Sequence, residues 1–149
     1  MNPAIRSTVV LVATVLATTA PARAGAQGAT RQVIGTSTAT LSPAIRWGDL
    51  VFASGQLGVS RSAPDSTIGG QTKLALDNLK GVLEQAGTSM ANVVKCTVFL
   101  VDIKDFGGMN QAYSAAFGKE PPARSTVIVA ALVSAAARVE IECIAGMPK

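Results

Sequence analysis

An arginine and a glutamate sixteen residues apart are the residues of this chain best suited to do chemistry. Arg124 stands just before an apolar run over residues 127–132, and Glu140 lies inside a second run over residues 139–145. A guanidinium beside apolar residues is costly to bury unless an anion meets it, so Arg124 requires a carboxylate of the protein or of a ligand. The sequence leaves open whether Arg124 and Glu140 form a structural ion pair or a binding site, because both arrangements perturb charges alike.

The chain contains no histidine, and this excludes more mechanisms than any other fact of its composition. Nucleophilic sites of the Ser-His and Cys-His kinds are excluded. Because the only cysteines are Cys96 and Cys143, with no CxxC or HExxH spacing, we expect no metal site. Proton transfer must therefore rest on Asp, Glu, Lys, Tyr or an ordered water, and buried carboxylates are the leading candidates.

The size and charge of the chain favour one domain without a polyanion partner. It has 149 residues, 48% of them hydrophobic, which is enough for a core of its own. The formal charge of +4 falls to +2 once Arg6 and Arg23 leave with the leader described below, since eleven Lys and Arg then face nine Asp and Glu. The few aromatic residues are scattered among hydrophobic positions, so we expect no nucleic-acid partner.

Residues 1–26 have the pattern of a secretory signal peptide. Arg6 precedes an apolar run over residues 8–20, and the small residues that follow offer cleavage after Ala24 or Ala26. The run is shorter than the ~20 residues that a membrane-spanning helix needs. We therefore expect a mature protein that is periplasmic or secreted and has no attachment to the membrane after cleavage.

Export would carry the two cysteines into an oxidising compartment. There Cys96 and Cys143 could pair. Both lie within apolar runs, however, and the interpretation we favour is two buried thiols; the sequence leaves the pairing open.

Hydrophobic periodicity predicts strands, a helix, a strand, a helix and two strands, with no repeat and no second domain. Residues 27–40 are rich in Gly, Ala, Thr and Ser, and we interpret them as a flexible lead-in to a domain over residues 41–149. The last two predicted strands could form an antiparallel pair. The predicted elements are strand 50–54, helix 71–86, strand 93–101, helix 105–117, and strands 124–132 and 138–145.

Seven separated segments of the chain form a recognisable set: residues 42–43 (SP), 50–56 (LVFASGQ), 75–80 (ALDNLK), 93–100 (VVKCTVFL), 109–113 (MNQAY), 122–127 (PARSTV) and 139–142 (VEIE). In order and spacing they resemble the RidA (YjgF-type) family of reactive-intermediate imine deaminases. The resemblance covers about residues 41–146. It implies an α+β fold of the chorismate-mutase-like (YjgF-type) kind, with a six-stranded mixed sheet packed on two helices. It also implies a homotrimer with ligand clefts between subunits.

The resemblance further implies hydrolysis of small 2-imino acids, or their enamine tautomers, to 2-oxo acids and ammonia without a cofactor or metal. Arg124 would hold the substrate carboxylate, which suits a planar fork of donors. Glu140 would position and activate the attacking water. The substrate-binding set implied by the family's motifs is completed by Ser54, Gly55, Ser125 and Thr126.

Other interpretations of these residues stay open. The segment 54–56 could simply be a turn that ends a strand, and Glu142, two residues after Glu140, is more typical of a structural charge. For the protein as a whole, the alternatives are a non-catalytic trimer that binds small carboxylates in the same clefts, or a ribonuclease, for which the sequence offers little basic surface.

The chain departs from the family's pattern at two positions. Ala44 stands where the family commonly has a tyrosine, and Thr126 stands where it often has a cysteine. A tyrosine would supply an aromatic wall and a phenolic hydrogen bond to the expected cleft. Ala44 therefore bears directly on which substrate the cleft accepts.

Overall fold

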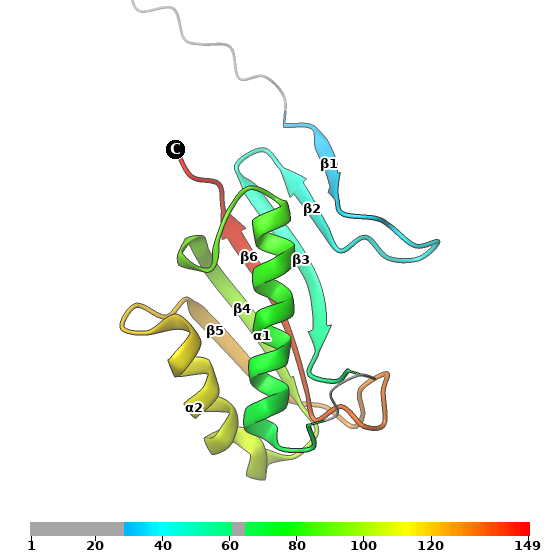
Figure 1. The fold of residues 1–149 in the computed structure, drawn as a ribbon, viewed down its shortest axis with the longest axis vertical. Coiled ribbons are helices and arrows are strands. Elements are labelled where there is room, and N and C mark those ends of the chain that lie inside the picture. Colours follow the sequence, from blue (N-terminus) through cyan, green and yellow to red (C-terminus); the bar gives the residue numbers. More distant parts are fainter. Residues whose placement is uncertain (1–28, 61–64) are drawn as a thin grey trace, which may run out of the picture.

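The computed structural model describes residues 29–60 and 65–149 and contains a six-stranded mixed sheet with two helices on one face (Figure 1). The expectation of this fold is confirmed. The signal peptide expected over residues 1–26 lies outside the described residues. The strand order is β1-β2-β3-β6-β4-β5. The strands are β1 Arg31–Ile34, β2 Ala44–Trp47, β3 Leu50–Leu57, β4 Val93–Leu100, β5 Ala123–Ile128 and β6 Val139–Gly146.

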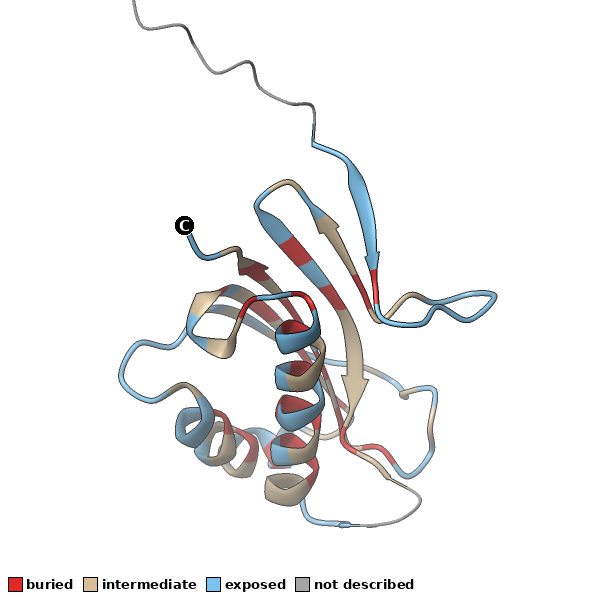
Figure 2. Ribbon diagram, turned by 45° about the horizontal axis from the view of Figure 1, so that its top comes forward, coloured by how far each residue is buried: buried red, intermediate tan, exposed pale blue. Residues whose placement is uncertain are grey.

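Two α-helices, α1 Ile68–Gln85 and α2 Phe106–Phe117, cover the same face of the sheet, and their buried sides face it (Figure 2). Short 3₁₀ turns precede β4 and α2, at Met90–Asn92 (η1) and Ile103–Asp105 (η2). Within the described part of the chain, no helix has the length and apolar character to cross a membrane.

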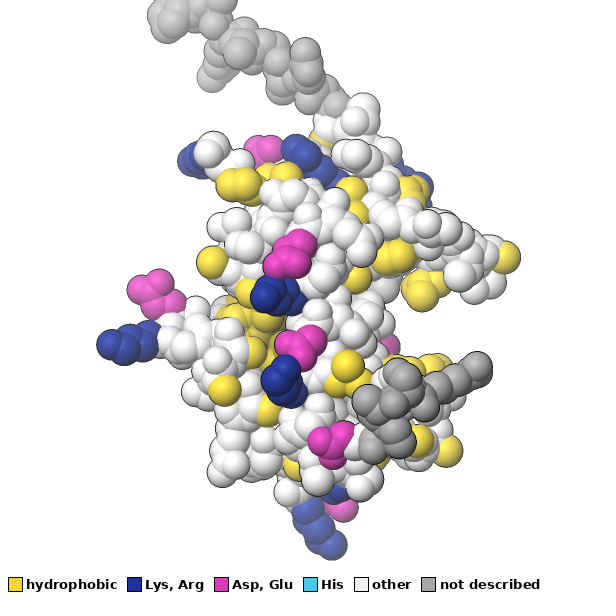
Figure 3. Space-filling view, viewed as in Figure 1, with side chains coloured by type: hydrophobic (Ala, Val, Ile, Leu, Met, Phe, Trp, Pro, Cys, Tyr) yellow, Lys and Arg dark blue, Asp and Glu magenta, His cyan; other side chains and the backbone are white. Residues whose placement is uncertain are grey.

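The amphipathic pattern of the first helix explains how α1 lies on the sheet. Thr67 caps its start, since the Thr67 hydroxyl accepts a hydrogen bond from the Gly70 amide at 3.1 Å. Its outward face carries ion pairs one turn apart, which form a row of alternating charge (Figure 3). These pairs are Lys73–Asp77 at 2.5 Å and Lys80–Glu84 at 3.9 Å.

The expectation that the last two strands pair with each other is wrong. β6 lies between β3 and β4 and is antiparallel to both, whereas β5 pairs with β4 in parallel at the edge of the sheet. The connection crosses the end of β4, where Val129 N donates to Leu100 O at 2.8 Å and Val101 N donates to Arg138 O at 3.3 Å. Two neighbours bury more of β6 than one neighbour would, and its alternate residues are fully covered.

The segment expected to be a flexible lead-in also differs from the structure. It contains β1, which pairs antiparallel with β2 and places Ile34 in the core at 7% exposure. A four-residue edge strand with a single buried side chain has too few residues to display a period, so the sequence could not indicate it.

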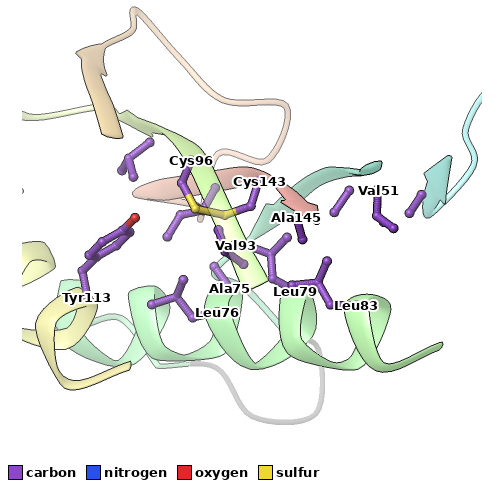
Figure 4. Packing of buried hydrophobic residues seen from close by; sticks show 14 of the residues in the cluster. Val51, Ala75, Leu76, Leu79, Leu83, Val93, Cys96, Tyr113, Cys143 and Ala145 are labelled. Carbon is purple, nitrogen blue, oxygen red and sulfur yellow. A yellow bond between two sulfur atoms is a disulfide. The ribbon is translucent and has the colours of Figure 1, made fainter. Parts of the chain in front are cut away.

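Cys96 and Cys143 form a disulfide at the centre of the sheet (Figure 4). Both are buried, as expected, but they are paired rather than free thiols. The reason is register: the two residues lie directly opposite each other on β4 and β6, with their Cα atoms 4.1 Å apart. The bond therefore joins β4 to β6 beneath the helices.

Candidate functional site

Arg124 lies on the helix-covered face of the sheet. On β5 it is opposite the buried Cys96 of β4, and paired residues point to the same face. Its guanidinium carbon is 4.7 Å from the ring centroid of Tyr113 and 5.9 Å from that of Phe106, and Nη1 donates to Met109 Sδ at 3.8 Å. The faces of these α2 rings attract the cation and hold it in place.

A cavity of about 410 Å³ opens beside this guanidinium. Its walls come from α2 and from the loop that leads into β5, namely Asn110, Tyr113, Ser114, Gly118, Pro121, Pro122 and Arg124. Across the described residues, Arg124 has no ion pair with a carboxylate of the protein. A half-buried arginine that lines a cavity and lacks a protein anion is suited to bind the carboxylate of a ligand.

Two hydroxyl groups near Arg124 are buried without a partner in the described part of the chain. The hydroxyls of Tyr113 and Thr126 are buried and have no hydrogen-bond partner among the described residues. Burial raises the pKa of Tyr113 to about 12, and the nearby positive charge of Arg124 offsets only part of the shift. Tyr113 therefore presents a neutral phenol to the site at any physiological pH.

Glu140 lies on the opposite face of the sheet, which no described helix covers. Its neighbours in sequence, Val139 and Ile141, are fully buried against the helices, so Glu140 points the other way. Its carboxylate rests against the backbone of Gly55, where an added Cβ would overlap a carboxylate oxygen. A side chain at position 55 would therefore require the Glu140 carboxylate to move. The Glu140 carboxylate has no ion pair or hydrogen bond within the described residues.

Residues 54–55 form a β-bulge rather than a turn that ends the strand. The register of β3 on β6 shifts between Ala53 and Gln56, and β3 continues to Leu57. A bulge bends the strand and re-aims its backbone, which is how Gly55 comes to meet Glu140. Ser54 is committed to the neighbouring segment, since its hydroxyl donates to Ser42 O at 2.7 Å.

The other predicted site residues divide between the faces. Ser125 lies on the open face, where its hydroxyl accepts from Lys95 Nζ at 2.6 Å. Thr126 lies on the helix-covered face, two residues after Arg124. Ala44, where the family commonly has a tyrosine, is fully buried in the core and paired with Ala53, so within one subunit it contacts neither Arg124 nor Glu140's face. Glu142 is exposed on the open face.

The predicted site is therefore split in two. We call Arg124 with Phe106, Met109 and Tyr113 the arginine half-site, and Glu140 with Gly55 the glutamate half-site. β4 separates their strands, and they lie on opposite faces of the sheet. An ion pair between Arg124 and Glu140, which the sequence left open, does not form within the described chain.

The aromatic partners of Arg124 are what sequence reasoning missed. Phe106, Met109 and Tyr113 lie in the helix predicted over residues 105–117, but the sequence did not indicate that they hold the arginine. Their spacing of three and four residues on one helix face is the available signal. Among the described residues there is no group of three or more potential metal-binding side chains.

This combination defines a class: an α+β domain with a cavity lined by an arginine at the edge of its sheet and, among the described residues, a glutamate without an ion pair on the sheet's open face. The chain matches the family described as endoribonuclease L-PSP over residues 31–147, and it belongs to that family, which is the RidA (YjgF) family. It is 42% identical to the 2-iminobutanoate/2-iminopropanoate deaminase of Rattus norvegicus over 123 residues, 77% of this chain and 89% of that protein.

Solved structures agree with this assignment. RidA from the Antarctic bacterium Psychrobacter is 35% identical with a TM-score of 0.72, covering 78% of this chain and 100% of that one. E. coli TdcF with bound serine is 31% identical with a TM-score of 0.72, covering 78% of this chain and 99% of that one.

Proposed function

We propose that this protein hydrolyses small 2-imino acids and their enamine tautomers to 2-oxo acids and ammonia. The observation that carries the proposal is Arg124, which lines a cavity, rests on two aromatic rings and has no carboxylate partner within the described chain. The relatives named as 2-iminobutanoate/2-iminopropanoate deaminases support the reaction type.

Arg124 binds the substrate carboxylate through two parallel hydrogen bonds and so fixes the position of the imine carbon. Glu140 orients a water toward that carbon, accepts one of its protons as the new C–O bond forms, and returns this proton to the nitrogen, which gives a carbinolamine. Glu140 then carries the hydroxyl proton of the carbinolamine to the amine nitrogen, and the C–N bond breaks as the C=O bond forms. Ammonia leaves, and the carbon keeps its oxygen as the 2-oxo group. Acid/base assistance of this kind contributes about 10²–10⁴-fold to the rate.

The split site requires a second subunit, and we propose a homotrimer in which Arg124 of one subunit meets Glu140 of its neighbour. The open face of the sheet supports this arrangement. It exposes large apolar side chains, among them Trp47, Leu50, Phe52 and Val127. An apolar face of this kind is typical of a surface that another protein covers. Three copies in a ring, each offering two different surfaces, form three equivalent clefts.

A second candidate is a non-catalytic trimer that binds small carboxylates. The serine bound to E. coli TdcF favours it, since an amino acid offers the same carboxylate to the same kind of cleft. A ribonuclease, which the family's description suggests, is disfavoured by a net charge near +2 after loss of the leader and by aromatic residues that are scattered among hydrophobic positions in the sequence rather than interleaved with basic ones.

The deciding experiment is hydrolysis of freshly generated 2-iminobutanoate by the purified mature protein, measured against a buffer blank. We expect Arg124→Ala to abolish binding and turnover without unfolding the protein, and Glu140→Gln to retain binding of 2-oxobutyrate but lose most of the rate. Lys73→Ala, which removes an exposed ion pair on α1, is the matched control and should behave as wild type. Binding of 2-oxobutyrate without hydrolysis above the blank would favour the binding protein.

We also propose that the protein is exported and that its mature chain begins at Gly25 or Gln27. The signal-like residues 1–26 and the disulfide between Cys96 and Cys143 support export, because disulfides persist mainly in oxidising compartments. N-terminal sequencing of protein recovered from the periplasm or medium tests this, and recovery of Met1 as the first residue would refute it.

A further inference from the structure

An ion pair between Asp105 and Arg138 closes the end of the sheet at which α1 begins. Asp105 is only 3% exposed. Arg138 Nε donates to one carboxylate oxygen at 2.9 Å, and Nη2 donates to the other. This two-point contact fixes direction as well as distance. The hydrogen bonds to Asp105 raise the pKa of Arg138 further above its ordinary value, so the pair stays charged.

Arg138 also holds the start of α1. Its Nη1 donates to Ser66 O at 3.0 Å, and its backbone amide donates to Gln71 Oε1 at 2.7 Å. Gln71 is 2% exposed, and its amide group donates in turn to Ala136 O at 2.9 Å. The pair thus connects the starts of α1, α2 and β6, three segments that are distant in sequence.

The carboxylate of Asp105 serves this contact instead of capping its own helix. Asp105 occupies the N-cap position of α2 but makes no side-chain cap hydrogen bond there. A capping aspartate normally stabilises its helix by satisfying free amides of the first turn. The start of α2 is therefore held by Arg138, across the fold, rather than by its own cap.

Both half-sites adjoin this pair. Asp105 immediately precedes Phe106, the first residue of α2, whose ring contacts the Arg124 guanidinium. Arg138 lies two residues before Glu140, just ahead of the first residue of β6. We propose that Asp105 and Arg138 are positioning residues that hold the arginine half-site and the glutamate half-site of one subunit in place, each for a different cleft of the proposed trimer, an inference that rests on the proposed function.

Removing the guanidinium leaves a buried carboxylate without a partner, and the chain around it must rearrange to reach water. Because Asp105 and Arg138 adjoin the first turn of α2 and the first residues of β6, we expect these two segments to move. A displacement of about 1 Å at a site costs on the order of 10²-fold in rate. We therefore expect Arg138→Met to lower kcat/KM by about 10- to 100-fold, through a higher KM from the arginine half-site and a lower kcat from the glutamate half-site.

The test compares Arg138→Met and Arg138→Lys with a control at the far end of β6. Lysine keeps a positive charge beside Asp105 but loses the fork, so it should recover part of the loss. The control is Thr88→Val, which removes a buried hydrogen bond from Thr88 Oγ1 to Gly146 O (2.6 Å) and so destabilises the fold away from both half-sites. Calorimetric titration with 2-oxobutyrate gives Kd and the number of competent sites. Hydrogen exchange follows residues 106–109 and 139–141.

The expected result is a weaker Kd and faster exchange in both segments for Arg138→Met, with partial recovery in Arg138→Lys, while Thr88→Val lowers only the melting temperature. A melting temperature or site count that falls at unchanged Kd and kcat per competent site would show a purely structural pair and overturn the inference. So would faster exchange in one segment alone or in neither. If the wild type hydrolyses no imine, the deaminase proposal fails, but Kd and exchange still decide the role of Arg138. If Arg138→Met does not fold, Arg138→Lys decides by the same criteria.

Discussion

The two half-sites differ in how the protein holds their charged groups. The guanidinium of Arg124 rests on the rings of Phe106 and Tyr113, beneath α2 and beside a cavity. The carboxylate of Glu140 rests on the backbone of Gly55 at a β-bulge, on a face without a helix. Packing within the subunit fixes the guanidinium of Arg124. The carboxylate of Glu140 is instead open to a group from outside the subunit.

This difference indicates that the proposed reaction takes place between two copies of the chain. An anion and a cation on opposite faces of one sheet cannot act on one small molecule from within that subunit. The two groups can act on one molecule if the open face of one copy covers the β5 edge of the sheet in the next copy. This contact would also bury the exposed apolar residues of the open face. In the proposed mechanism the same difference separates substrate binding, assigned to the arginine half-site, from proton transfer, assigned to the glutamate half-site.

Mixing two inactive variants tests the split most severely. Arg124→Ala and Glu140→Gln should each be nearly inactive alone. In trimers formed from equal amounts of both, a cleft is intact when its Arg124 comes from the Glu140→Gln copy and its Glu140 from the Arg124→Ala copy. Random assembly makes about one quarter of the clefts intact, because each cleft joins two different surfaces in a ring.

The measurement is imine hydrolysis by the two variants co-expressed, against each alone. We expect recovery from background to about a quarter of the wild-type rate per cleft. A mixture that stays at background, while both variants remain trimeric by sedimentation, would mean that one subunit supplies both residues, and the proposed arrangement would be wrong.

The sequence predicts the fold and the identity of the charged residues better than their placement. Separated motifs indicated the sheet and both helices. Strand order was not accessible, because the pairing of β5 and β6 with β4 depends on contacts between distant segments rather than on local pattern.

For the same reason the sequence could not predict that Arg124 and Glu140 lie on opposite faces of the sheet. Arg124 stands just before an apolar run and Glu140 alternates with apolar residues, but which face each of them takes depends on the register of β5 and β6 against β4. The disulfide was left open on the same grounds, since only that register brings Cys96 opposite Cys143. The Asp105–Arg138 pair has no sequence signal at all, because its partners are joined through the tertiary fold.

Removing the disulfide tests whether the strands between the half-sites need a covalent bond. The bond spans 47 residues, and a loop of that length corresponds to about 4 kcal/mol in the chain-entropy account. We expect the double variant Cys96→Ala, Cys143→Ala to lose about that free energy of unfolding, measured with urea, and to keep its KM when folded. Unchanged stability would show that packing alone fixes β4 against β6.

The pH dependence of stability tests whether the arginine half-site is as dry as its packing indicates. Below pH 10 the phenol of Tyr113 is protonated in both the folded and the unfolded chain. Because burial raises its pKa to about 12 in the folded state, the unfolded state ionises first and stability falls as pH rises from 10 to 12. The loss is about 2–3 kcal/mol beyond that of Tyr113→Phe. Parallel profiles for both proteins would mean that water reaches the hydroxyl.

The smallest effect concerns the ring of Phe106, which is the more distant of the two aromatic rings that contact Arg124. Phe106 is 40% exposed, so Phe106→Ala should cost little stability but remove one cation–π contact of about 0.5–1 kcal/mol. The Kd for 2-oxobutyrate should then rise by about two- to fivefold, because the guanidinium is less firmly held before the ligand arrives. Ile103→Ala is the control, since Ile103 is a nearby apolar residue that is 65% exposed and makes no contact of this kind with Arg124. Equal affinities for wild type and Phe106→Ala would assign the hold on Arg124 to Tyr113 and Met109 alone. A loss in kcat at unchanged Kd would instead link this ring to the glutamate half-site of the neighbouring subunit and so weaken the division between binding and proton transfer.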